Sequence, residues 1–110
     1  MPTNLSDLEQ LVLLALLRLG DGAYGVAIAK ELAERAHRSV SYATIYKALI
    51  RLETDRLIEG RVGEPTKERG GRRKRYYRLR PAGQAALAAS LEAIQRMSDG
   101  VASFAVGRSR

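Results

Sequence analysis

Residues 57–80 read LIEGRVGEPTKERGGRRKRYYRLR, and this stretch indicates two strands joined by a loop. The side chains of residues 57–62 are expected to point alternately to the two faces of a strand, with Leu57, Glu59 and Arg61 on one face and Ile58, Gly60 and Val62 on the other. Residues 74–80 form a second strand-like run that is rich in Tyr and Arg. A proline and a Gly-Gly pair lie between the two runs, which is typical of a connecting loop. The sequence therefore predicts a β-hairpin with a long loop.

The excess charge of the chain lies in the same region. Residues 61–80 hold nine Lys or Arg and two Glu, so they carry +7, which equals the formal net charge of all 110 residues. Like charges this close repel one another, so folding alone does not account for them. A basic segment of this kind indicates a surface that binds a polyanion.

Two helices are expected near the start of the chain. Ser6 and Glu9 form a capping box ahead of leucines at three- and four-residue spacing, which predicts a helix over about 6–19. We expect Gly20, Asp21 and Gly22 to end this first helix. A second helix is expected over about 24–36, where apolar residues and charged residues fall on different faces.

A third helix is expected over about 41–54, with Ser41 as its N-cap. Ile45, Leu49 and Leu52 share one face and predict its buried side. The flanks and the far side carry polar and aromatic residues, namely Tyr42, Thr44, Tyr46, Lys47 and Arg51.

A last helix is expected to begin at Pro81 and to continue to about Val106. Its large apolar residues recur along one stripe, which would be left in water on a monomer: Leu87, Leu91, Ile94, Val101 and Phe104. We interpret this stripe as a dimer interface. The pair at 99–100, Asp-Gly, is a point where the helix could kink or end.

Three helices, two strands and a final helix follow the order of a winged helix-turn-helix domain. The predicted fold class is thus mainly α with a small β-hairpin. Residues 1–80 form the DNA-binding domain in this interpretation, and 81–110 form a C-terminal dimerisation helix and tail. The third helix is expected to enter a major groove, while residues 61–80, the wing, lie along the backbone or minor groove.

Three stretches resemble the PadR family of winged-helix transcriptional regulators: AYGVAIAKEL, SYATIYKALIRLETDRLI and GGRRKRYYRLRPAGQAAL. The short C-terminal part is similar to the shorter branch of that family. The resemblance implies a homodimer that binds an imperfectly palindromic operator in double-stranded DNA and usually represses. It also implies that the helix after the wing dimerises, and that small aromatic or drug-like effectors can release the DNA.

The candidate DNA-binding residues come from the third helix and the wing. They are Ser41, Tyr42, Thr44, Tyr46, Lys47, Arg51, Arg69, Arg72, Arg73, Lys74 and Arg75. Among the helix residues, Tyr42, Thr44 and Lys47 are the first candidates for contacts with bases, whereas the wing arginines are expected to face phosphates. Of the two adjacent wing tyrosines, Tyr76 and Tyr77, we expect one to be buried.

Cofactor, metal and catalytic sites are not expected. The run Gly20–Gly25 matches G-x-G-x-x-G, but a helix rather than a strand precedes it, so we interpret it as a helix stop and turn. His37 is the single histidine and the chain has no cysteine, so no His/Cys metal site or thiol nucleophile is available. We expect His37 to be a solvated loop residue and the protein not to be an enzyme.

The longest apolar run, Leu11–Leu17, is too short to span a bilayer, and residues 1–5 lack the basic start of a signal peptide. We therefore expect a cytoplasmic protein with no membrane partner. Two alternatives to a DNA-binding regulator stay open from the residues alone. One is an RNA-binding or ribosome-associated basic module, and the other is a protein-interaction domain whose basic loop meets an acidic partner.

Overall fold

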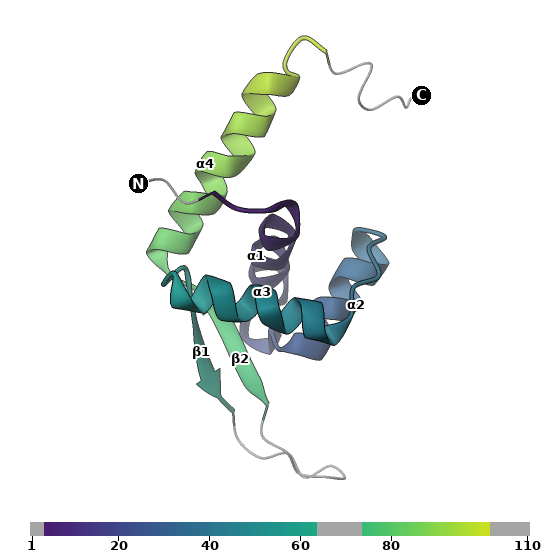
Figure 1. The fold of residues 1–110 in the computed structure, drawn as a ribbon, viewed down its shortest axis with the longest axis vertical. Coiled ribbons are helices and arrows are strands. Elements are labelled where there is room, and N and C mark those ends of the chain that lie inside the picture. The colour runs from purple at the N-terminus through teal and green to yellow at the C-terminus, as the bar shows by residue number, and fades with distance from the viewer. Residues whose placement is uncertain (1–3, 64–73, 102–110) are drawn as a thin grey trace.

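Three helices pack together beside a two-stranded hairpin, and a fourth helix projects from this body (Figure 1). The computed structural model describes residues 4–63 and 74–101. The elements in chain order are α1 (Asp7–Leu19), the short 3-10 helix η1 (Gly20–Gly22), α2 (Gly25–Arg35), α3 (Tyr42–Thr54), β1 (Ile58–Val62), β2 (Arg75–Leu79) and α4 (Pro81–Ser98). The winged-helix order predicted from the sequence is confirmed.

The helix α1 begins with the predicted capping box. The Ser6 hydroxyl accepts a hydrogen bond from the Glu9 amide at 3.1 Å, and the Glu9 carboxylate accepts one from the Ser6 amide at 2.9 Å. Gly20, at φ +59°, ends the helix in the left-handed region that favours glycine. The glycines at 20–25 therefore form a turn after a helix, as expected, and not a dinucleotide-binding loop.

The helix α3 ends in a Schellman motif that turns the chain into β1. The Leu57 amide donates to the Leu52 carbonyl and the Arg56 amide donates to the Glu53 carbonyl, both at 3.0 Å. Arg56 has φ +62°, so a long basic side chain occupies the position that glycine usually takes in this motif. Leu57 is buried as a result, and β1 starts directly under the helix.

The hairpin is antiparallel, and Gly60 of β1 lies opposite Tyr77 of β2. The segment between η1 and α2 adds a short bridge to it. Tyr24 pairs with Tyr76, and the Tyr77 amide donates to the Ala23 carbonyl at 2.9 Å. The hairpin is therefore held against the start of α2 as well as beneath α3.

The core lies where α1, α2, α3 and the hairpin meet. Ile45, Leu49 and Leu52 are buried in it, as the third-helix pattern predicted. Its other large members are Val12, Leu13, Leu16, Ile28, Leu32, Leu57, Ile58, Tyr77 and Leu87. The expectation that one wing tyrosine is buried is confirmed by Tyr77, whereas Tyr76 is partly exposed.

The start of α4 is fixed to the body. A Cβ atom on Gly83 would lie 2.1 Å from the Leu57 carbonyl oxygen, so only glycine lets the helix approach this closely. Leu87 is buried in the core of its own chain, and the expectation that it belongs to an exposed stripe is wrong. Beyond it the helix projects away from the body, and Leu91 and Ile94 are exposed (Figure 1).

The end of α4 comes earlier than the sequence pattern suggested. The helix stops at Ser98, because Asp99 adopts an extended conformation and Gly100 has φ +85°. The expected continuation to Val106 is therefore wrong. Val101 is half exposed and lies after the helix rather than on it, and Phe104 lies outside the described residues.

Candidate nucleic-acid interface

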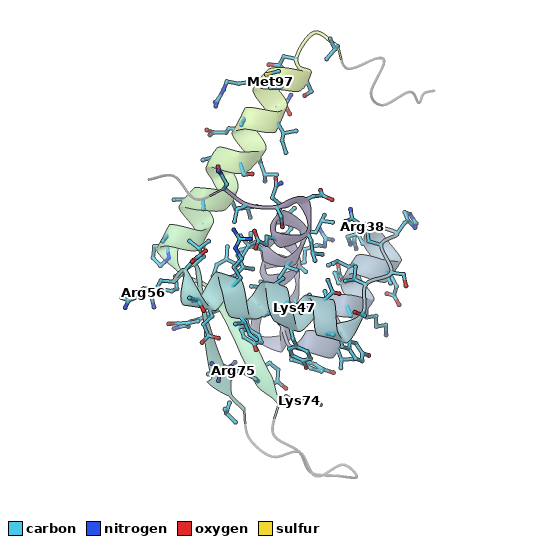
Figure 2. The ribbon with its side chains drawn as sticks, in the orientation of Figure 1. Arg38, Lys47, Arg56, Lys74, Arg75 and Met97 are labelled. Carbon is cyan, nitrogen blue, oxygen red and sulfur yellow. The ribbon has the colours of Figure 1, made fainter. Side chains whose placement is uncertain are left out.

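One side of α3 faces outward along its whole length. Ser41 caps the helix by accepting a hydrogen bond from the Thr44 amide at 3.2 Å, and its hydroxyl donates to the Thr44 hydroxyl at 3.0 Å. Tyr42 and Lys47 are also exposed, and Figure 2 labels Lys47 on the part of α3 nearest the viewer.

Tyr46 connects the exposed side of α3 to the beginning of α2. A Cβ atom on Gly25 would lie 2.6 Å from the Tyr46 hydroxyl oxygen, so the tyrosine ring occupies the space that this glycine leaves. Gly25 therefore allows the close packing of α2 against Tyr46. Tyr46 is still 43% exposed, so its ring edge remains accessible beside Lys47.

The root of the wing holds two basic side chains on tyrosine rings. The Lys74 ammonium lies 4.8 Å from the centre of the Tyr24 ring, and the Arg61 guanidinium lies 5.2 Å from that of Tyr76. The two rings meet edge to face with centres 5.5 Å apart. This packing orders two cations at the base of the hairpin.

These two surfaces meet at the start of α2. Tyr46 of α3 covers Gly25, the first residue of α2, and Lys74 of β2 covers Tyr24, its N-cap residue. The outward side of α3 and the basic root of the wing thus form one continuous face. Its polar, aromatic and cationic groups are of the kinds that contact base edges and phosphates.

No group of three His, Cys, Asp or Glu residues that could hold a metal ion occurs within 4–63 and 74–101. A helix long and apolar enough to cross a membrane is likewise missing from the described part of the chain.

His37 has φ +55°, and the amide of the next residue donates to the Leu32 carbonyl at 3.0 Å. The histidine is exposed at this helix end, as expected of a solvated loop residue.

The amino-acid sequence matches a known protein family. Residues 13–89 match the transcriptional regulator PadR-like family, and this span includes α3, the wing and the fixed part of α4. The chain belongs to the PadR-like family. The resemblance inferred from three short stretches is therefore confirmed.

This PadR-like chain is similar to other transcriptional regulators. The transcriptional regulator Rv3488 of Mycobacterium tuberculosis is 38% identical over 77 residues, which are 68% of this chain and 65% of that protein, just under two thirds of its length. A transcriptional regulator from Clostridium thermocellum is 28% identical with a TM-score of 0.70, covering 87% of this chain and 90% of that one. Bacillus subtilis PadR, solved in complex with operator DNA, shares the fold at 24% identity and a TM-score of 0.66, covering 77% and 46%.

The PadR-like fold brings five of the candidate residues onto the face described above: Ser41, Tyr42, Thr44, Tyr46 and Lys47 from α3, with Lys74 from the wing beside them. Arg51 and Arg75 have partners inside the chain instead. Arg51 pairs with Glu9 at 3.3 Å, and Arg75 pairs with Glu53 at 2.7 Å. Both arginines therefore make contacts within the chain that the sequence did not predict. Arg69, Arg72 and Arg73 lie outside the described residues.

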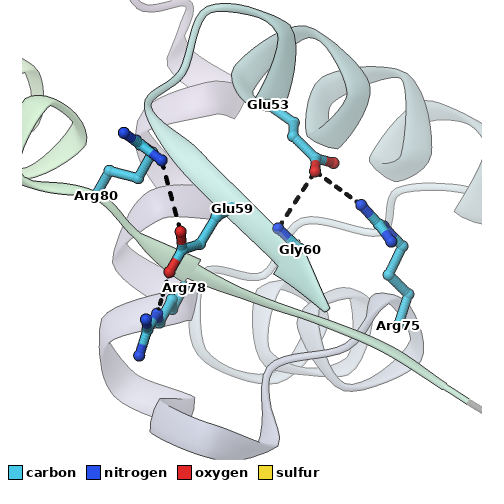
Figure 3. A network of polar contacts seen from close by, with 6 residues as sticks. All are labelled: Glu53, Glu59, Gly60, Arg75, Arg78 and Arg80. Atoms are coloured by element: carbon cyan, nitrogen blue, oxygen red, sulfur yellow. Dashed lines mark hydrogen bonds and ion pairs between the residues drawn. The ribbon is translucent and has the colours of Figure 1, made fainter. Parts of the chain in front are cut away.

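Two more residues shape the interface and were missed from the sequence. Glu53 of α3 contacts both strands of the hairpin, and Gly60 of β1 leaves the space that Arg75 fills (Figure 3). A glycine inside a strand is a signal of close approach by another group, so Gly60 could have been recognised. Burial also raises the pKa of the Tyr77 hydroxyl beside this contact above its usual value.

Proposed function

We propose that this PadR-like protein is a homodimeric repressor that binds a palindromic operator, with α3 in the major groove and the wing along the DNA backbone. The observation that carries the proposal is the continuous face where the outward side of α3 meets the wing root at Tyr24 and Gly25. Bacillus subtilis PadR, which shares the fold, was solved in complex with operator DNA, and this supports DNA as the partner. No catalytic activity of its own is part of the proposal.

The charge distribution supports a role for the wing in affinity. Residues 61–80 carry the whole net charge of +7. In the proposed complex each phosphate that a wing cation neutralises adds about −0.9 to the slope of log K against log salt. Lys74, Arg69, Arg72 and Arg73 supply these contacts, whereas Lys47, Tyr42 and Thr44 read bases.

The distal half of α4 is the proposed dimer interface. Leu91, Ile94 and Met97 are 39, 54 and 82% exposed, and Val101 follows at 50%. Burial of each large apolar side chain contributes ~1.5–3 kcal/mol, so a two-fold pairing of these residues holds two chains together. The dimer places two α3 helices about one DNA turn, ~34 Å, apart.

The proposed function is tested by selection from a pool of random-sequence duplexes with the purified protein, in the presence of structured RNA as competitor. Enrichment of one sequence with two-fold symmetry supports a dimeric DNA-binding repressor. Retention of the RNA in place of any duplex would instead support a basic RNA-binding module. Retention of neither, even at low salt, would indicate that the basic wing meets a protein partner.

A further inference from the structure

One carboxylate of α3 holds both strands of the hairpin. Glu53 Oε2 accepts a hydrogen bond from the Gly60 amide of β1 at 3.3 Å and from Arg75 Nη2 of β2 at 2.7 Å (Figure 3). Glu53 lies in the last turn of α3, on the same rigid helix as Lys47. The carboxylate of Glu53 therefore connects both strands of the hairpin to α3.

Arg75 occupies a defined space in this contact. A Cβ atom on Gly60 would lie 2.8 Å from Cζ, Nε and Nη2 of Arg75, so any residue other than glycine would displace the guanidinium. On another side the guanidinium lies 5.7 Å from the centre of the Tyr77 ring. The arginine is thus held by a carboxylate, a ring and the backbone of the opposite strand.

We propose that Glu53 and Arg75 are a positioning pair that sets the direction of the wing relative to α3, and that Arg75 is not one of the phosphate contacts. The inference rests on the proposed DNA-binding function. A two-stranded hairpin has little stability of its own, so its direction depends on what it contacts. If α3 and the wing are to reach the groove and the backbone together, the angle between them has to be fixed before binding.

A second pair on the same hairpin provides a matched control. Glu59 of β1 contacts Arg78 and Arg80, the latter at 3.5 Å, and no hydrogen bond or ion pair of Glu59 to α3 is present among the described residues (Figure 3). Glu59→Ala removes the same charge as Glu53→Ala and frees two arginines of the wing. Glu59→Ala therefore measures the effect of removing one negative charge while the contact of Glu53 with the hairpin is kept.

The experiment measures the affinity of each variant for the selected duplex over a range of salt concentrations. Removal of a carboxylate makes the protein more positive, which by charge alone strengthens binding to DNA. We expect Glu53→Ala to weaken binding about tenfold despite this, and Glu59→Ala to leave it unchanged or stronger. Arg75→Ala is expected to weaken binding to the same extent as Glu53→Ala, with the slope of log K against log salt unchanged.

The double variant Glu53→Ala/Arg75→Ala is expected to bind no more weakly than either single variant, because the two residues act as one unit. Hydroxyl-radical footprints add a readout that a general loss of stability would not produce. The protection by the wing should become diffuse, while methylation protection of guanine N7 in the major groove should stay sharp. Thermal unfolding of each variant, measured in parallel, verifies that the domain is folded at the temperature of the binding assay.

Three results would overturn this inference. One is that Glu53→Ala strengthens binding as Glu59→Ala does. Another is that Arg75→Ala makes the slope of log K against log salt less negative by about 0.9, as loss of a phosphate contact would. The third is that the two single losses add in the double variant. Failure of the wild-type protein to bind any duplex would contradict the proposed function itself, so the two failures are distinguishable.

Discussion

The guanidinium of Arg51 on α3 lies 3.3 Å from the carboxylate of Glu9 on α1, whose side chain is only 6% exposed. The other carboxylate oxygen of Glu9 accepts the Ser6 amide in the capping box. A buried carboxylate is therefore satisfied on both sides, once by the first turn of its own helix and once by the helix proposed to read DNA. Because Arg51 neutralises this group, we assign it to the stability of the domain rather than to base contacts.

Arg51→Ala is accordingly expected to lower the free energy of unfolding by about 1–2 kcal/mol. The substitution leaves a buried carboxylate without its cation, although water replaces part of the interaction because Arg51 itself is largely exposed. Urea unfolding measures the loss. The slope of log K against log salt for DNA binding should not change.

Arg35→Ala is the matched control for this prediction, since Arg35 forms an exposed i,i+4 pair with Glu31. Exposed pairs of this kind contribute only about 0.3–0.5 kcal/mol, so the control should be nearly as stable as the wild type. If Arg51→Ala left the stability unchanged and made the slope of log K against log salt less negative, Arg51 would instead contact the DNA.

A stabilising substitution is expected at the end of α3. Arg56 has φ +62°, where a side chain with a Cβ is strained and glycine is not. Arg56→Gly should raise the free energy of unfolding by about 1 kcal/mol, which corresponds to several degrees in Tm for a domain of this size. Arg56→Ala keeps the strain and should give no such gain. Loss of stability in the glycine variant would show that the Arg56 side chain makes a contact of greater value.

Local signals explain how much of this fold the sequence predicted. Ser6, Ser41 and Pro81 each act within one helical turn of their own position, so three helix starts were placed to within a residue. The end of α4 was misplaced because apolar residues continue at helical spacing beyond Asp99 and Gly100. The backbone of these two residues, extended and then left-handed, ended the helix despite that pattern.

Contacts between distant parts of the chain account for what the sequence did not predict at the site. Glu9 was recognised as half of a capping box, yet its partner Arg51 is 42 residues away and carries no local mark of that pairing. Likewise, Arg75 is one of many arginines in the wing. Only the fold reveals that it faces Glu53 across Gly60. Composition identified a basic surface, and tertiary packing decides which cations remain available to a ligand.

The dimer predicted for α4 depends on its projecting half. Leu91→Glu/Ile94→Glu introduces two charges into the proposed interface, and desolvation of these charges should prevent pairing. Sedimentation is expected to show a dimer for the wild type and a folded monomer for the variant. Arg96→Glu changes the net charge by the same two units at an exposed position on the other side of the same helix and should remain dimeric. A folded Leu91→Glu/Ile94→Glu variant that still sediments as a dimer would exclude this interface.

The central claim, that the outward side of α3 reads DNA sequence, is tested most directly through Lys47. The measurement is the affinity for the selected duplex relative to a random duplex, for the wild type, Lys47→Ala and the control Arg35→Ala. We expect the wild type and the control to prefer the selected duplex by at least a thousandfold. Lys47→Ala should reduce that preference by ~1–3 kcal/mol, the value of a good base contact. Equal binding of the wild type to both duplexes, or an unchanged preference in Lys47→Ala, would contradict the assignment of Lys47 on α3 as a base-reading residue.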